Sequence, residues 1–112
     1  MQERTTGQSS INVEPESGEK GPAIVDVETL CGIDLNLLII FVAVYQERSL
    51  SKAAKKLGVT QPAISNSLVK IRRHFADSLF ERAGYGMKPT PRAQVIYNHL
   101  APAIAAIHLV LK

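Results

Sequence analysis

Apolar residues recur with a helical period through most of the chain after residue 33. The first such run contains Leu37, Phe41 and Val44 at spacings of four and three. Asp34 stands directly ahead of the run, where an Asx side chain often caps a helix N-terminus. A first helix is therefore predicted to begin after Asp34 and to end near Glu47.

A short second helix is predicted over residues 52–57, with Ser51 ahead of it as a cap. Gly58 follows, at the position where a left-handed residue commonly ends a helix. The adjacent Ala53 and Ala54 leave room for another helix to approach closely. A turn of three or four residues is implied after this helix.

A third helix is predicted to begin after Thr60, with Pro62 in its first turn, where the missing N–H has no intrahelical partner. One apolar stripe runs along it, formed by Ile64, Leu68, Ile71 and Phe75. The opposite face carries Pro62, Asn66, Val69 and Arg73, flanked by Ser65 and Lys70. A face that is polar toward its start and basic toward its end is unusual for a purely structural helix.

Two short strands, 79–82 and 87–89, are predicted around a glycine-containing turn at 83–86. Thr90 and Pro91 then open a last helix that continues to the end of the chain. Its apolar positions have a coiled-coil spacing and are Ile96, Leu100, Ala103, Ile107 and Val110. Pro102 lies inside this helix, so a kink is expected there.

The predicted fold is all-α: a winged helix-turn-helix, with a three-helix core and a two-stranded wing, followed by a long C-terminal linker helix. Residues 34–90 form the winged domain, and residues 91–112 form the linker helix. Residues 1–33 are rich in Gln, Ser, Gly, Glu and Pro and lack sustained periodicity. They are predicted to be an acidic, mostly disordered tail, with 23–30 as a candidate for a short element.

The charge of the chain is divided unevenly. The formal net charge is +3 over 112 residues. Residues 1–33 hold two basic and six acidic side chains, a net −4, whereas residues 34–112 hold eleven basic and four acidic side chains, a net +7. The basic character belongs to the part that is predicted to fold, and it implies a polyanionic partner.

Catalysis, metals and cofactors are not expected. Cys31 is the only cysteine, which excludes an internal disulfide and a Cys-cluster metal site. An inert side chain is expected there, with a regulatory thiol or an intermolecular bridge as the alternative. His74, His99 and His108 are scattered, with no companion at ligand spacing. No nucleophile paired with a base, no carboxylate pair and no phosphate-binding glycine loop is present, so the chain is predicted not to be an enzyme.

Secretion and membrane insertion are not expected either. No secretory signal is visible, and the apolar run 35–44 falls short of the about 20 residues that span a bilayer. The expectation is a soluble, cytoplasmic protein without a membrane partner.

Residues 49–68 (SLSKAAKKLGVTQPAISNSL) combine a short Ala-rich helix, a glycine turn and a capped helix with an exposed polar face. In a helix-turn-helix the second helix lies in the major groove and its first residues reach base edges. We therefore predict sequence-specific binding of double-stranded DNA. Base contacts are expected from Gln61, Pro62, Ser65 and Asn66.

The residue types suit this role. Gln61 and Asn66 can present a donor and an acceptor to adenine, and Pro62 offers apolar contact to a thymine methyl. Each good bidentate contact contributes about 1 to 3 kcal/mol of discrimination. Two structural alternatives to DNA contact stay open. Gln61 supports the turn, or the lysines of the predicted second helix form a solvent-exposed face without a partner.

Phosphate contacts are expected from the basic side chains Lys52, Lys70, Arg72 and Arg73. In the hairpin, Arg82, Tyr85 and Lys88 are placed where a wing follows the backbone into the adjacent minor groove. If about six cations meet phosphates, log K falls with log salt at a slope near −5.

Four local motifs occur together: 51–54 (SKAA), 61–65 (QPAIS), 79–82 (LFER) and 89–93 (PTPRA). From about Asp34 onward the chain resembles the N-terminal domain of LysR-type transcriptional regulators, most of all the branch with LeuO and the nodulation regulators. The resemblance implies base contacts by the four residues named above, phosphate contacts by Ser51, Lys52 and Arg82, and pairing of two subunits through the linker helix. The full expected phosphate set is then Ser51, Lys52, Thr60, Lys70, Arg72, Arg73, Arg82 and Lys88.

Members of the family usually carry a two-lobed effector-binding domain after the linker helix, so the chain is interpreted either as a fragment or as a regulator without a small-molecule sensor. Ser78 and Ala93 replace residues that are often Pro and Gly, which affects the wing and the linker. A homodimer on paired half-sites is expected; the alternative is a short protein-interaction module that dimerises with full-length regulators and modulates them.

Overall fold

The computed structural model describes residues 25–112, and the chain divides into two units that meet between Ile33 and Asp34. In the first unit, α1 (Val27–Cys31) is a short, exposed helix. It overlaps residues 23–30, which were named only as a candidate for a short element in a tail predicted to be mostly disordered. The Asp26 carboxylate caps it by accepting hydrogen bonds from Thr29 Oγ1 and Thr29 N, at 2.8 and 3.2 Å. The hydroxyl bond is the main cause of a lowered pKa for Asp26. The rest of the predicted tail, residues 1–24, lies outside the described residues.

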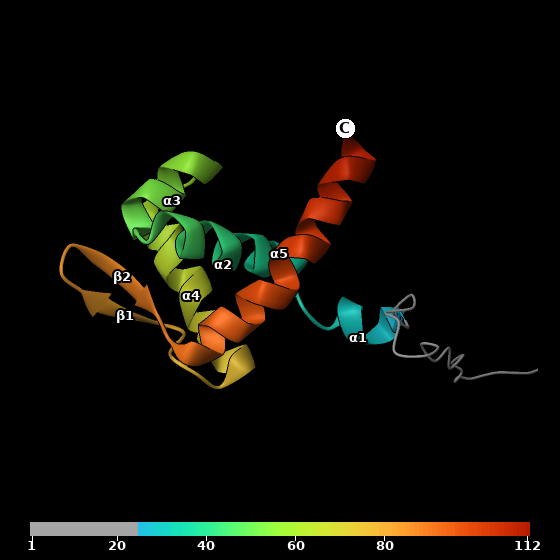
Figure 1. Cartoon of the computed structure of the whole chain (residues 1–112), viewed down its shortest axis with the longest axis horizontal. Coiled ribbons are helices and arrows are strands. Elements are labelled where there is room, and N and C mark those ends of the chain that lie inside the picture. The colour runs from blue at the N-terminus through green and yellow to red at the C-terminus, as the bar shows by residue number, and fades with distance from the viewer. Residues whose placement is uncertain (1–24) are drawn as a thin grey trace, which may run out of the picture. The chain divides into compact units, whose positions relative to one another are not determined.

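The second unit combines three packed helices, a hairpin and a long helix (Figure 1). Its elements are α2 (Leu35–Glu47), α3 (Leu50–Leu57), α4 (Gln61–Phe75), β1 (Phe80–Ala83), β2 (Gly86–Pro89) and α5 (Pro91–Leu111). The mostly helical architecture with a two-stranded antiparallel wing confirms the predicted fold class.

Local capping interactions set the helix boundaries. The side chains of Asp34 and Thr60 accept a backbone N–H in the first turns of α2 and α4, as predicted. Gly58 ends α3 with a φ of 70°, also as predicted. The start of α3 was predicted wrongly: Ser49, not Ser51, is its cap, and Ser49 Oγ accepts from Lys52 N at 3.1 Å. Ser51 therefore lies inside the first turn of the helix.

The core lies where α2, α3 and α4 meet. Ala53 and Ala54 are buried, and their small side chains let α3 approach the other two helices closely. Phe41 of α2 contacts Phe80 of β1 with ring centroids 5.4 Å apart, which fixes the base of the wing to the core. The remaining large buried side chains are Val44, Ile64, Leu68, Ile71 and Leu79.

The loop between α4 and β1 holds two residues in the left-handed region. Ala76 has a φ of 53° and the fully buried Leu79 has a φ of 63°. The carboxylate of Asp77 stabilises this turn, because its Oδ2 accepts from Leu79 N at 2.9 Å and from Thr90 Oγ1 at 2.8 Å. Since Thr90 caps α5, one carboxylate joins the end of α4 to the start of α5.

The strands β1 and β2 pair antiparallel from Phe80 opposite Pro89 to Ala83 opposite Gly86. The loop between them has two residues, Gly84 and Tyr85, so the turn is tighter than the predicted one. Gly84 has a φ of 59°, which places the positive φ at the first central residue, as in a type II′ turn.

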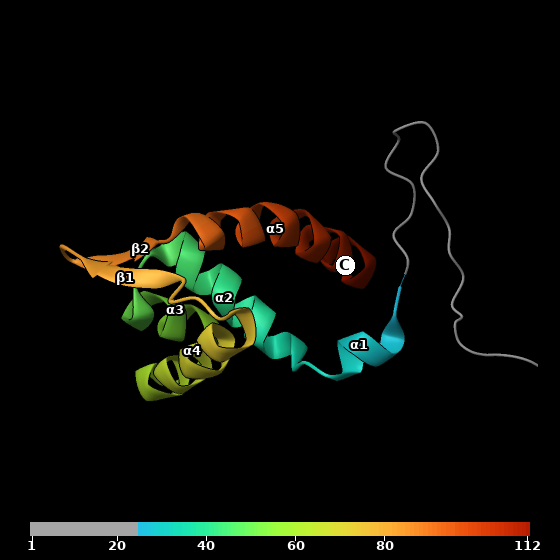
Figure 2. The ribbon, with the colours of Figure 1, turned by 90° about the horizontal axis from the view of Figure 1, so that it is seen from below.

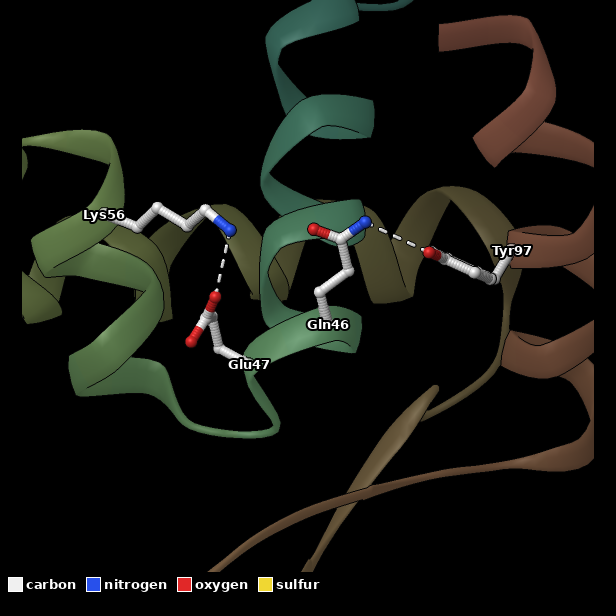
Figure 3. Close-up of polar contacts among 4 residues, drawn as sticks. All are labelled: Gln46, Glu47, Lys56 and Tyr97. Carbon is white, nitrogen blue, oxygen red and sulfur yellow. Dashed lines mark hydrogen bonds and ion pairs between the residues drawn. The ribbon is translucent and has the colours of Figure 1, made fainter. Parts of the chain in front are cut away.

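The helix α5 is continuous through Pro102, and its axis curves in Figure 2, where α2 lies between α5 and the α3–α4 pair. Tyr97 of α5 stacks on Tyr45 of α2 at 3.9 Å between centroids and 5° between planes. Figure 3 shows two further contacts of α2: Gln46 Nε2 donates to the Tyr97 hydroxyl at 3.1 Å, and Lys56 Nζ of α3 donates to Glu47 Oε2 at 3.0 Å. These contacts dock α3 and the first half of α5 onto the same helix.

Candidate nucleic-acid interface

The side chains predicted to read bases lie on the first half of α4. Gln61, Pro62 and Asn66 are exposed, and Ser65 is half-buried. Their positions are one and four residues apart, so at 100° per residue they share one face of the helix. Thr60 precedes them as the cap, and its Oγ1 accepts from Ala63 N at 3.2 Å. The hydroxyl of Thr60 accepts this bond, and its own O–H can still donate to a phosphate oxygen.

Gln61 is the point where three elements converge. One cleft joins it to α3, at Ser51, Lys52 and Lys55. A second cleft joins it to the wing, at Arg82 and at residues 85–87. The starts of two helices and the wing thus border the same surface, which is the arrangement that a helix in a major groove and a wing beside it require.

A groove runs between α4 and the wing, lined by Ser65, Val69, Arg82 and Met87 among others. Val69 is 49% exposed, although it is apolar and lies one turn after Asn66. Val69 was predicted to lie on the exposed face of this helix but was not among the predicted base contacts. Its signal was present in the sequence, because a β-branched apolar residue on a polar face offers contact to a thymine methyl.

Most of the side chains predicted to meet phosphates are exposed. This exposed group includes Ser51, Lys52, Arg73, Arg82 and Lys88. Ser51 and Lys52 lie in the first turn of α3, where backbone N–H groups and the helix dipole favour an anion.

Lys70 and Lys56 occupy different surroundings. Lys70 lies on the flank of α4 that faces α2, in a groove with Leu37, Ile40 and Ser67. Lys56 pairs with Glu47, although the Lys56 side chain is 54% exposed. Lys70 therefore lies apart from the wing, and Lys56, the last lysine of α3, has an intramolecular partner.

Arg72 is placed differently from its predicted role. Its Nε donates to the carbonyl oxygen of Ser78 at 2.7 Å, and its Nη2 donates to the carbonyl oxygen of Phe80 at 3.1 Å. The side chain is half-buried and ties α4 to the entry of β1. Arg72 is thus used inside the fold, and the neighbouring Arg73 is the exposed arginine of the pair.

The predicted apolar seam of α5 is divided into two parts. Ile96 and Leu100 are half-buried and pack against the core of their own chain. Ala103, Ile107 and Val110 are exposed, and Val110 is 82% exposed. Among residues 25–112, α5 is the one helix that is long and apolar enough to cross a membrane by length and composition.

Within the described part of the chain, no group of three or more His, Cys, Asp or Glu side chains is placed to hold a metal ion. Cys31 is exposed in α1. The chemistry of the site is therefore that of amides, hydroxyls and cations on one surface.

A short helix, a glycine turn, an exposed helix with amides and a basic two-stranded wing define a winged helix-turn-helix protein. Residues 35–94 match the family of bacterial regulatory helix-turn-helix proteins of the lysR type. The chain belongs to this LysR family, which confirms the resemblance seen in its motifs.

Similar proteins are transcription regulators. The chain is 51% identical over 77 residues to the transcriptional activator NagR of Ralstonia sp, covering 68% of this chain and 24% of NagR. It is 41% identical over 75 residues to the regulator LeuO of Escherichia coli K12, covering 67% of this chain and 24% of LeuO. The chain thus spans about a quarter of the length of these relatives.

A solved structure has the same fold. The DNA-binding domain of BenM, crystallised in complex with benA site 1 DNA, superimposes with a TM-score of 0.65 at 29% identity, covering 70% of this chain and 89% of that domain. The described winged unit therefore has the fold of a LysR-type DNA-binding domain.

Proposed function

We propose that the chain binds double-stranded DNA sequence-specifically and regulates transcription, with α4 in the major groove. The observation that carries this proposal is the convergence of α3, α4 and the wing on Gln61. The names of the relatives NagR and LeuO, and the DNA complex of the BenM domain, support it. We infer a cytoplasmic location from the same bacterial relatives.

Base readout is assigned to Gln61, Pro62, Ser65 and Asn66, the residues of the exposed first half of α4. The two amides match the donor and acceptor edge of adenine. Phosphate contacts are assigned to Ser51, Lys52, Thr60, Lys70, Arg73, Arg82 and Lys88. Arg72 leaves this set because its guanidinium is bound to two backbone carbonyls. With five cations on phosphates, the expected slope of log K against log salt is about −4.5 for each subunit.

We infer further that two copies pair through the second half of α5. Ala103, Ile107 and Val110 form its exposed apolar stripe, at spacings of four and three. Covering a side chain such as Val110 stabilises by about 1.5 to 3 kcal/mol. A two-fold dimer binds two half-sites separated by about one turn of DNA or a multiple of it.

Selection of bound sequences from a random duplex pool tests the DNA-binding function. Enrichment of a two-fold-related motif is expected, because each subunit presents one α4. An unenriched pool after repeated rounds at low salt would contradict specific binding.

Variants then separate base from phosphate contacts. Gln61→Ala and Asn66→Ala should reduce affinity for the selected motif by about 1 to 3 kcal/mol and change binding to random DNA little. Lys70→Ala is the matched control, since it should weaken both duplexes equally. Equal losses on both duplexes for the Gln61 variant would remove Gln61 from base readout.

The exposed half of α5 favours a second candidate, an interaction module that pairs with other regulators of the family. Such a module would form mixed dimers with a relative and show no salt-dependent binding to DNA on its own. Gel-shift titration of the chain at two salt concentrations distinguishes the two functions.

A further inference from the structure

The wing is attached to the helical core at a second point besides its base. Arg48 caps the C-terminus of α2 in the left-handed region, with a φ of 55°, and its N–H donates to the carbonyl of Val44 at 2.7 Å. Its own carbonyl oxygen accepts from Met87 N of β2 at 2.9 Å. One backbone hydrogen bond thus joins the loop between α2 and α3 to the middle of the wing.

The residue before Met87 fits this contact only as glycine. A Cβ built on Gly86 would stand 2.3 Å from the carbonyl oxygen of Arg48. Because the obstacle is backbone and not a flexible side chain, any larger residue must displace the strand or the loop. Gly86 therefore has a steric requirement, whereas Gly84 at the tip has open space around its Cβ position.

The side chain of Arg48 lies back against the last turn of α2. Its Nε donates to the carbonyl of Tyr45 at 2.7 Å, and the guanidinium lies 4.8 Å from the centroid of the Tyr45 ring. The same ring stacks on Tyr97 of α5. The anchor of the wing is thus continuous with the contacts that dock α5.

The anchored strand residue is adjacent to both basic residues of the wing. Met87 pairs with Arg82 across the hairpin, and Lys88 is its neighbour in β2. An isolated two-stranded hairpin is marginally stable, so a lateral bond near its middle controls where these cations are held.

We propose that Arg48 is a positioning residue for DNA binding: its carbonyl holds the wing so that Arg82 and Lys88 reach phosphates while α4 occupies the groove. This inference rests on the proposed DNA-binding function. It assigns no contact with DNA to Arg48 itself, since the backbone of Arg48 acts through the wing.

Gly86→Ala tests the anchor, with Gly84→Asn as the control in the same hairpin. Asn tolerates the positive φ of residue 84 and meets nothing there. On the selected duplex, Gly86→Ala should lose the hydroxyl-radical protection that flanks the α4 contact and lower the magnitude of the salt slope by about 1.8, the value for two cations. The preference of Gly86→Ala between duplexes that differ by one base pair under α4 should match that of the unmodified chain. Gly84→Asn should match the unmodified chain in its flanking protection, its salt slope and this preference.

A second pair of variants decides the case if Gly86→Ala does not fold. Arg48→Gly keeps the carbonyl and adopts a positive φ freely, so it should retain the flanking protection. Arg48→Val resists that φ because it is β-branched, so it should lose the protection while circular dichroism shows a folded protein.

The outcomes separate the two claims. A footprint and salt slope equal to those of the unmodified chain, in folded Gly86→Ala or in Arg48→Val, would overturn the anchor alone. Absence of DNA binding by the unmodified chain would overturn the proposed function, and the positioning role with it.

Discussion

Arg72 and Arg73 are adjacent arginines with different expected roles. Substitution of Arg72 should lower the stability of the fold, and substitution of Arg73 should weaken the contact with DNA phosphates. Arg72 makes two hydrogen bonds to backbone carbonyls at the entry to β1, one of them half-buried. A hydrogen bond from a charged group contributes about 1.5 to 3 kcal/mol, and the exposed one contributes less. Arg72→Ala should therefore lower the free energy of unfolding by about 2 to 3 kcal/mol. For a domain of this size that corresponds to a melting temperature lower by roughly 10 to 20 °C.

Arg73→Ala is the matched control. Arg73 is exposed on α4, so its removal should change the free energy of unfolding by no more than about 0.5 kcal/mol. Removing its phosphate contact should lower the magnitude of the salt slope by about 0.9, whereas Arg72→Ala should leave the slope unchanged below its melting temperature. Arg72→Lys should not restore stability, because an ammonium group cannot donate to both carbonyls in the planar geometry of the guanidinium.

Thermal unfolding followed by circular dichroism measures the stability of these variants. Fluorescence anisotropy of a labelled duplex between 50 and 200 mM salt measures the slope. Arg72→Ala could instead melt at the same temperature as the unmodified chain and lower the magnitude of the salt slope by about 0.9. In that case the guanidinium of Arg72 would be a phosphate contact, and its proposed role in stabilising the fold would be wrong.

Three further variants test other parts of the structure. Ala76→Gly should raise the stability by about 1 kcal/mol in chemical denaturation, because Ala76 is exposed with a φ of 53° and glycine removes that strain; an unchanged midpoint would contradict this. Tyr97→Ala should cost at least about 1 kcal/mol by loss of the stack on Tyr45, whereas Tyr97→Phe keeps the stack and should melt close to the unmodified chain. Ile107→Asp should convert a dimer to a monomer in analytical ultracentrifugation with the circular dichroism retained, and a dimer of unchanged mass would refute pairing through α5.

Helix caps were predictable from the sequence where one candidate stood at the right distance from an apolar run. Asp34 and Thr60 are such cases, and both cap as expected. For α3 only Ser51 was predicted as the cap, whereas Ser49, two residues earlier, is the cap in the structure. The structure selects Ser49 because the longer helix brings Leu50 against the core, a tertiary contact that local sequence does not reveal.

The roles of single residues within a predicted surface were harder to assign. The helical period places Arg72 at the edge of the buried stripe of α4, but its acceptors are carbonyls of a loop with two positive φ angles, which no residue pattern specifies. The apolar seam of α5 is continuous in the sequence, yet Ile96 and Leu100 pack against the core of their own chain. Periodicity identified the apolar face and could not show which part of it was already covered.

The composition of α5 has a practical consequence for handling the protein. From Ala93 to Leu111 it contains no Asp, Glu, Lys or Arg, whereas the α3, α4 and wing surface is basic. Concentrated salt strengthens apolar association and displaces proteins from phosphates. Buffers of high ionic strength should therefore strip carried-over nucleic acid during purification while leaving subunits together, so that assembly is measured without interference from duplex.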